Sequence, residues 1–408
     1  MNINLWVSTD ETANWLAENT ILKNFDFNVK ELVESDANKP KQFHRIPEAI
    51  KRILYLDAVD IIIEINKKPV LAVEISHEAG TGHNAFQRFA RLVAAAEYDI
   101  PVAYIYPEAG FIHRSNSDRW DAINPTIFRA LEKVMQIHNS PALLYYYPSE
   151  FDGDYTSVPS HSSKGLIHDD YYLSLPNSKD SEMQDFFQFV NTILERIINN
   201  ERELSLINDS LISKRRDWMQ EQFILKGGNN KVWSPNTSTI KVSTSSLIKF
   251  LMKYSGKSYD FGDLLLSRKY TLIYMVNANL RGDPYPGALS ALDYLNTRIG
   301  KNIEDRCMNL VMAWCALEYD EKNDELILID GKSSINDFMK SVNQVRDKNK
   351  CLLSYDDYNE LSSKKYNIPR YYMQVNHSCR FTKKKELRVY SVFADAILFK
   401  DGCLWKDG

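Results

Sequence analysis

The stretch that decides the fold runs Asp60-Ile-Ile-Ile-Glu-Ile65, Asn66-Lys67-Lys68, Pro69-Val-Leu-Ala-Val-Glu-Ile-Ser76. Two apolar, β-branched runs flank a short polar break, which predicts two antiparallel strands joined in a hairpin. With a three-residue connection Ile65 pairs with Pro69, and counting back along both strands places Asp60 opposite Glu74 on one face of the sheet. The sequence therefore predicts that these two carboxylates meet.

Two ionised carboxylates about 5 Å apart repel each other unless a cation lies between them. Mg2+, for which Mn2+ can substitute, prefers oxygen ligands of this kind, and the Ile75 carbonyl offers a third oxygen. Such an ion can activate a water and stabilise the charge that develops on a phosphodiester. Asp57 competes with Asp60 for the first carboxylate position, because a bend in the chain would exchange them. The alternative is an acidic pair on a solvated sheet face. Glu64 shares the face of Asp60 and is expected either to support the metal ligands from behind or to be an acidic residue of an edge strand.

The residues after the hairpin predict a helix and a further strand. Gly80-Thr81-Gly82 breaks the chain, apolar residues recur at helical spacing over 84–98, and 101–106 is an apolar run bounded by proline. On that helix Gln87 and Arg91 are one turn apart and share a face, so both are expected to point toward the metal and a phosphate. The alternative is a solvated helix face. His77 is expected to be structural rather than catalytic.

The order Asp60, a spacer of thirteen residues, Glu74-Ile75-Ser76, helix and strand resembles the PD-(D/E)xK nuclease superfamily, which includes most type II restriction endonucleases. The resemblance covers about residues 37–108. It implies an α/β (α+β) fold with a mixed central sheet flanked by helices, in which Asp60 and Glu74 are the metal-binding carboxylates.

Ser76 stands where this superfamily usually has the lysine that orients or activates the attacking water. The stretch from Glu74 to Arg91 is similar to a variant of some restriction enzymes, with Ser or Thr in place of lysine and a glycine-rich turn before the helix. The resemblance therefore implies a catalytic role for Ser76, and it leaves Gln87, Arg88 or Lys68 as candidates for the lysine's part.

Composition divides the chain into three parts. Residues 1–150 are expected to be the catalytic core, 151–232 a loop-rich connection with a long helix over 183–225, and 233–408 a mixed C-terminal domain for DNA recognition or dimerisation. In this third part, helices are expected over 244–254, 288–298 and 335–348, and strands over 325–330 and 387–399. A rival site lies in the third part, where a strand over 325–330 leads into Asp330-Gly331-Lys332. A surface hairpin is the simpler interpretation of this stretch, since Asp-Gly is a strong turn dipeptide.

Basic residues concentrate near the C-terminus, although the whole chain carries a net charge of −4. Between Ser362 and Arg388 eight basic residues and one acid give a local charge of +7, interleaved with aromatic side chains that can stack on bases. The residues expected to bind nucleic acid are Lys364, Lys365, Arg380, Lys383, Lys384 and Lys385, together with Arg88 and Arg91 near the metal. A second basic stretch is Lys214-Arg215-Arg216. A solvated charged face is the alternative for both stretches.

The 408 residues are 44% apolar and 25% charged, a composition that excludes fibrous and disordered chains. No apolar run is long enough for a membrane helix, so a cytoplasmic protein is expected. Five cysteines in no metal-like spacing argue against a disulfide framework and a zinc site. The leading hypothesis is a Mg2+-dependent, sequence-specific endonuclease that binds double-stranded DNA as a homodimer. The alternatives are a nuclease acting on RNA or on non-specific DNA, and a non-catalytic DNA-binding protein with a degenerate nuclease fold.

Overall fold

The chain forms two compact units, one of Met1–Glu34 with Ile46–Val232 and one of Ser35–Arg45 with Trp233–Gly408. The computed structural model describes residues 1–33, 43, 45–77, 84–113, 118–162, 164–199, 206–229, 231–232, 237–255, 265, 268–276, 284–302, 304–330, 371–375, 378–382, 389–390, 392–400 and 404–406. Both units combine mixed sheets with flanking helices, which confirms the expected α/β class. The segment 151–232, expected as a connection, lies within the first unit.

The first unit is built on a six-stranded mixed sheet in the order β2-β1-β3-β4-β5-β8. Its strands are β1 (Ile3–Val7), β2 (Phe27–Glu31), β3 (Ile61–Ile65), β4 (Lys68–Ile75), β5 (Val102–Pro107) and β8 (Ala142–Tyr147). Strands β4, β5 and β8 run parallel to one another, whereas β3 is antiparallel to both β1 and β4. Every residue of β3, β5 and β8 is buried. Continuous apolar runs are typical of a sheet that is covered on both faces.

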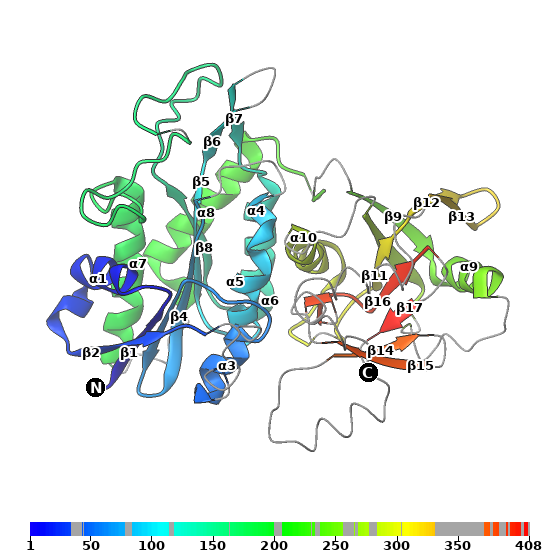
Figure 1. Cartoon of the computed structure of the whole chain (residues 1–408), viewed down its shortest axis with the longest axis horizontal. Coiled ribbons are helices and arrows are strands. Elements are labelled where there is room, and N and C mark those ends of the chain that lie inside the picture. The colour runs from blue at the N-terminus through cyan, green and yellow to red at the C-terminus, as the bar shows by residue number, and fades with distance from the viewer. Residues whose placement is uncertain are drawn as a thin grey trace, which may run out of the picture. The chain divides into compact units, whose positions relative to one another are not determined.

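Helices cover both faces of this sheet. Helices α1 and α7 lie on one side, and α3, α5 and α6 lie on the other (Figure 1), while α8 packs against α6 and β8. The helices are α1 (Asp10–Glu18), α3 (Glu48–Leu54), α4 (Asn84–Gln87), α5 (Phe89–Ala96), α6 (Thr126–His138), α7 (Ser181–Ile198) and α8 (Ser210–Leu225), with 3-10 turns at Ile21–Asn24 and Leu206–Asn208. In the described parts of the chain, none of the helices has the length and apolar character needed to cross a membrane.

The β3–β4 hairpin has the predicted register, but its turn is shorter than predicted and one strand contains a bulge. Its connection has two residues rather than three, since Ile65 pairs with Lys68 and both turn residues, Asn66 and Lys67, have positive φ. A bulge then inserts Val70 on β4, so that beyond it the pairing is Ile61 with Val73. Because the shorter turn and the added residue compensate, continuing this register places Asp60 opposite Glu74.

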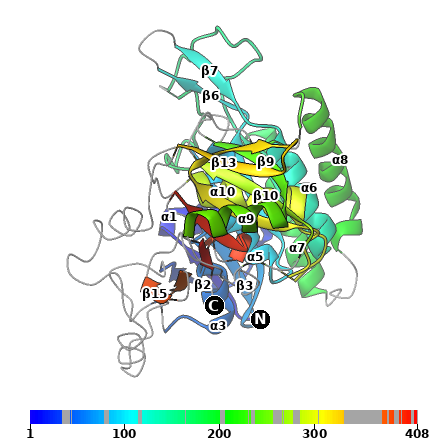
Figure 2. The same cartoon turned by 90° about the vertical axis from the view of Figure 1, so that its right-hand side faces the viewer.

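A two-stranded ribbon, β6 (Ala109–Ile112) and β7 (Arg119–Ala122), extends beyond the end of the main sheet (Figures 1 and 2). The segment between β8 and α7 runs alongside it and is hydrogen-bonded to both strands: the Phe111 N–H donates to the Lys164 carbonyl at 3.1 Å, and the Trp120 N–H donates to the Tyr155 carbonyl at 3.4 Å. The loop-rich stretch expected after residue 150 is therefore fixed to the first unit by backbone hydrogen bonds.

The second unit has a seven-stranded mixed sheet in the order β15-β14-β17-β16-β11-β10-β9. Its strands are β9 (Thr237–Ser243), β10 (Tyr270–Val276), β11 (Asn309–Trp314), β14 (Tyr371–Val375), β15 (Ser378–Thr382), β16 (Ala396–Phe399) and β17 (Leu404–Lys406). The helices are α9 (Thr244–Ser255) and α10 (Pro284–Leu292), which is followed by a π-helical turn over Asp293–Thr297. Leu247, Leu251, Ile273, Val311 and Leu398 belong to its core.

A buried ion network lies in this second unit. Arg306 is 6% exposed and donates to both Asp293 oxygens, at 2.7 and 3.0 Å, and to Asp395 Oδ1 at 3.1 Å. Asp395 also accepts from the Leu310 N–H at 2.8 Å. Charges this deeply buried are compatible with folding because each is paired and hydrogen-bonded.

The rival hairpin is present as β12 (Ala316–Asp320) and β13 (Glu325–Asp330), a separate two-stranded sheet. Its exposed residues include Ile327 and Ile329, as expected of a surface hairpin. Lys332 lies outside the described residues.

Two predicted elements differ from the structure, and nothing tests a third. The helix expected over 183–225 is divided into α7 and α8. The strand expected over 387–399 is present only as β16, because the described residues Val389, Tyr390, Val392 and Phe393 are helical. The helix expected over 335–348 lies outside the described residues.

Candidate active site

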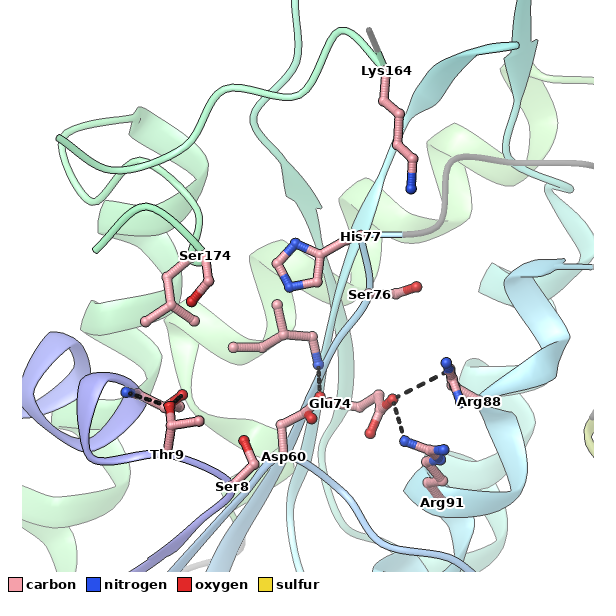
Figure 3. Close-up of a pocket in the computed structure, with 13 residues that line it drawn as sticks. Ser8, Thr9, Asp60, Glu74, Ser76, His77, Arg88, Arg91, Lys164 and Ser174 are labelled. Atoms are coloured by element: carbon pink, nitrogen blue, oxygen red, sulfur yellow. Dashed lines mark hydrogen bonds and ion pairs between the residues drawn. The ribbon is translucent and has the colours of Figure 1, made fainter. Parts of the chain in front are cut away.

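Asp60 and Glu74 come together where β3 begins and β4 ends. The Asp60 N–H donates to the Val73 carbonyl at 3.1 Å, and the Ile75 N–H donates to Asp60 Oδ2 at 2.7 Å. These two bonds fix the Asp60 carboxylate beside that of Glu74 (Figure 3). The juxtaposition predicted from the hairpin is therefore present in the folded chain.

Glu74 is buried with one of its oxygens unsatisfied. Its side chain is 1% exposed, and Oε1 receives Arg91 Nη1 at 3.2 Å and lies 3.7 Å from Arg88 Nε. Oε2 is buried and has no hydrogen-bond partner. Burial, and then the charge of Asp60, raise the pKa of Glu74 well above its usual value, against the opposing charges of Arg91 and Arg88. A buried carboxylate oxygen without a donor favours a proton or a metal cation beside it.

Asp60 is half-buried, and its pKa is also raised. Burial raises its pKa, against the hydrogen bond from the Ile75 N–H and the charge of Arg91. Two adjacent acids with raised pKa values bind a proton or a cation readily, because either removes their mutual repulsion.

The donor set fits Mg2+. Asp60 and Glu74 supply carboxylate oxygens, and the Ile75 carbonyl lies on the same side of β4 as the Ile75 N–H, which points at Asp60. In the described residues no group of three or more His, Cys, Asp or Glu side chains is placed to hold a metal. Mg2+ commonly uses one or two carboxylates and keeps several waters, so two acids and a carbonyl suffice.

Asp57, the other candidate for the first carboxylate ligand, is hydrogen-bonded to neighbouring residues and does not line the pocket. Its Oδ2 accepts from Arg91 Nε at 2.8 Å, and its Oδ1 accepts from the Ala58 N–H at 2.9 Å. Asp57 is not among the residues that line the pocket around Asp60. The structure thus brings Asp60, and not Asp57, to Glu74, and Asp57 instead helps to position Arg91.

Gln87 does not line the pocket, and the residues of this helix that do are Arg88 and Arg91. The expected continuous helix is interrupted at Arg88, between α4 and α5. At this break the Tyr104 hydroxyl donates to the Ala85 carbonyl at 3.2 Å, an acceptor that an unbroken helix would use for its own N–H. The shared face expected for Gln87 and Arg91 is therefore replaced by one formed by Arg88 and Arg91.

Ser76 lines the pocket directly after the carboxylates. Its side chain is buried, and its N–H donates to the Ile105 carbonyl at 2.9 Å, so strand pairing fixes its position. Figure 3 shows its hydroxyl on the same side as Arg88. Glu64, at the other end of β3, does not line the pocket. It is 1% exposed rather than on an edge strand, and it accepts from Asn4 Nδ2 at 2.7 Å and Trp6 Nε1 at 2.8 Å.

The pocket has a volume of about 410 Å3 and includes residues that the hairpin pattern does not predict. These residues are Ser8, Thr9, Thr12, His77, Lys164, Ser174 and Leu175. Hydroxyl groups from the start of α1 and from Ser174 lie across the pocket from Arg88 and Arg91, and Lys164 reaches in from above (Figure 3). No local motif marks these residues, because they approach the carboxylates only through the packing of α1 and of the segment before α7.

His77 lies against two side chains at the rim of the pocket. Its ring centroid is 5.4 Å from that of Tyr147 and 6.0 Å from that of His168, and the Tyr147 hydroxyl is 2.6 Å from His168 Nδ1. Burial lowers the pKa of His77, and the charges of His168 and Lys164 lower it further. His77 therefore lines the pocket beside the carboxylates, and its expected role as a structural residue stays a prediction.

The residues expected to bind nucleic acid near the C-terminus fall largely outside the described part of the chain. Lys364, Lys365, Lys383, Lys384 and Lys385 are outside it, and Arg380 belongs to β15. In the second basic stretch, Arg215 is 7% exposed and donates to Glu182 Oε1 at 3.2 Å and Oε2 at 2.5 Å. Its guanidinium lies 3.6 Å from the ring centroid of Trp218. Arg215 is thus a buried structural residue and not part of a basic surface.

Comparison with known proteins finds no family model, no curated protein and no solved structure that matches this chain. The chemistry of the pocket is therefore the basis for assigning a function.

Proposed function

We propose that this chain is a Mg2+-dependent endonuclease that hydrolyses phosphodiester bonds in double-stranded DNA, with the site-specific action of a type II restriction enzyme. The observation that carries the proposal is the buried Glu74 Oε2, which has no hydrogen-bond partner and lies beside Asp60. Its expected partners are double-stranded DNA and a second copy of the chain, and its expected location is the cytoplasm. Two copies related by a two-fold axis would present one site to each strand of a palindrome.

Each group at the site has a place in this chemistry. A metal held by Asp60, Glu74 and the Ile75 carbonyl would lower the pKa of a bound water and stabilise charge on the phosphate. Hydrolysis breaks the bond between phosphorus and the sugar oxygen: the hydroxyl part of the water remains on phosphorus, and its proton goes to the departing oxygen. Arg88 and Arg91 line the same pocket, where guanidinium groups favour phosphate oxygens.

Plasmid DNA with Mg2+ tests the proposal directly. We expect discrete fragments from the wild type and none from Asp60→Ala or Glu74→Ala. Glu64→Gln is the matched control, because Glu64 is as buried as Glu74 and lies in the same hairpin but outside the pocket. This variant should cut as the wild type does, provided that its melting temperature shows a folded protein.

Three results would each change the proposal. Failure of the wild type to cut DNA or RNA with Mg2+ or Mn2+ would refute it and leave a non-catalytic binding protein. Cleavage of RNA alone would replace DNA as the substrate. Loss of cleavage in Asp330→Ala with full activity in Glu74→Ala would move the site to the β12–β13 hairpin.

A further inference from the structure

Lys164 is the one lysine among the described residues that lines the pocket. It lies in the segment between β8 and α7, ninety residues beyond Glu74, and its side chain extends into the pocket from the end remote from Asp60 and Arg91 (Figure 3). No described carboxylate lies within ion-pair distance of its ammonium, whereas Lys179 of the same segment is paired with Asp170 at 2.8 Å.

The backbone at Lys164 is held in place on both sides. Its carbonyl accepts from the Phe111 N–H at 3.1 Å, and its N–H donates to Ser162 Oγ at 3.3 Å. The next residue, Gly165, has φ +68°, and a Cβ there would lie 2.1 Å from Trp120 Cη2. These contacts hold the backbone at Lys164 against the β6–β7 ribbon, from which its side chain extends into the pocket.

Several groups that line the pocket with the Lys164 ammonium favour an anion, because they are cationic or carry hydroxyls. His77 and His168 lie at the rim of the pocket, with their ring centroids 6.0 Å apart. The hydroxyls of Ser8, Thr9 and Ser174 also line the pocket. An ammonium without an acidic partner, a wall of hydroxyls and two guanidiniums surround a volume large enough for a phosphate group.

We propose that Lys164 is a catalytic residue whose ammonium donates a hydrogen bond to a non-bridging oxygen of the phosphodiester bound beside Asp60 and Glu74. The proposal rests on the proposed function and adds to it that the segment between β8 and α7 forms part of the active site. The ammonium transfers no proton. It offsets the negative charge that grows on the phosphate oxygens while the bond to the sugar breaks.

Two measurements on the full chain test this role. The first is plasmid cleavage with Mg2+ by Lys164→Met, Lys164→Arg and the matched control Lys179→Met. We expect Lys164→Met to cut about 100-fold more slowly, the loss typical for one donor to a developing anion. Lys164→Arg should recover part of the rate, and Lys179→Met should cut normally. The second is acetylation of the wild type with and without plasmid DNA in Ca2+, in which DNA should protect Lys164 but not Lys179.

The four combined outcomes are distinct. A slow Lys164→Met variant and a protected Lys164 support the inference. Cleavage at the wild-type rate by Lys164→Met, or an unprotected Lys164 in a protein that cleaves, overturns it and leaves the proposed nuclease intact. A protected Lys164 in a protein that cleaves nothing overturns the catalytic role together with the nuclease and leaves only a contact with nucleic acid. Neither cleavage nor protection overturns both.

Discussion

Gly165→Ala is expected to destabilise the first unit more than a replacement at any open glycine with the same backbone conformation. Gly165 has φ +68°, and an added Cβ would lie 2.1 Å from Trp120 Cη2 and 2.7 Å from Cζ3. Trp120 is 2% exposed, its Nε1 donates to the Ser157 carbonyl at 2.9 Å, and its ring packs against Phe111 and Phe151 with centroids 5.5 and 5.3 Å away. The indole therefore has little room to withdraw.

The stability lost in Gly165→Ala has two contributions. An L residue in the left-handed region costs about 1–2 kcal/mol, and overpacking against a fixed ring costs about 1–3 kcal/mol, so the expected loss is about 2–5 kcal/mol. Gly227 is the matched control, because its φ is +67° and nothing lies within 4 Å of an added Cβ. Gly227→Ala carries only the first part, so the two variants should differ by about 1–3 kcal/mol.

Urea-induced unfolding, followed by circular dichroism, measures the free energy that each variant loses. The comparison holds if both variants keep the wild-type m value. Equal losses for Gly165→Ala and Gly227→Ala would refute the contact with Trp120. A second test is the double variant with Trp120→Phe, which removes the ring atoms that the Cβ would meet and should bring the cost of Gly165→Ala down to that of Gly227→Ala. If the double variant keeps the full cost, the strain lies elsewhere in the loop.

Three further outcomes follow from buried charges. Because burial raises the pKa of Glu74 above its unfolded value of 4.5, the metal-free protein should lose stability as pH rises above about 4.5 toward the folded pKa. Urea unfolding over a pH series should show a smaller loss in Glu74→Gln than in the wild type, because Asp60, whose pKa burial also raises, still titrates in the variant. Arg306→Met removes both hydrogen bonds from Arg306 to the buried Asp293, which keeps Arg298 at 3.3 Å as its ion-pair partner, and should cost the second unit about 3–5 kcal/mol in the same assay. Arg215→Met removes the ion pair with Glu182, whose side chain is 24% exposed, so it should lower stability by a smaller amount, about 1–3 kcal/mol, without weakening DNA binding measured by fluorescence anisotropy.

Each of these outcomes has a result that contradicts it. A constant difference between wild type and Glu74→Gln at every pH would show that Glu74 has the same pKa in both states. A melting temperature unchanged in Arg306→Met would mean that the network contributes no net stability. Weaker DNA binding by a fully folded Arg215→Met would return Arg215 to the candidate nucleic-acid contacts.

The hairpin was predictable because its evidence is local. Apolar runs on both sides of a polar break indicate two strands, and the count of residues between Asp60 and Glu74 sets their register. The count agrees with the structure although the turn is one residue shorter, since Val70 restores the missing position. The assignment of Asp60 rather than Asp57 was favoured by the same counting.

The rest of the pocket depends on packing between distant segments. Lys164 and Ser174 approach the carboxylates only after β8 has joined the sheet and the following segment has bonded to the β6–β7 ribbon. The placement of Arg88 instead of Gln87 follows from a hydrogen bond donated by the Tyr104 hydroxyl, nineteen residues beyond its Ala85 acceptor. No periodicity over a short window contains such information.

The bulge at Val70 also limits how this hairpin can vary in length. Successive side chains of a strand point to opposite faces, so one residue added to or removed from the hairpin would turn Glu74 away from Asp60. An insertion in the turn could be tolerated only together with a deletion at the bulge, or the reverse. Hairpin length is therefore constrained as strictly as the identity of the two acids, although the turn lies at the far end of both strands.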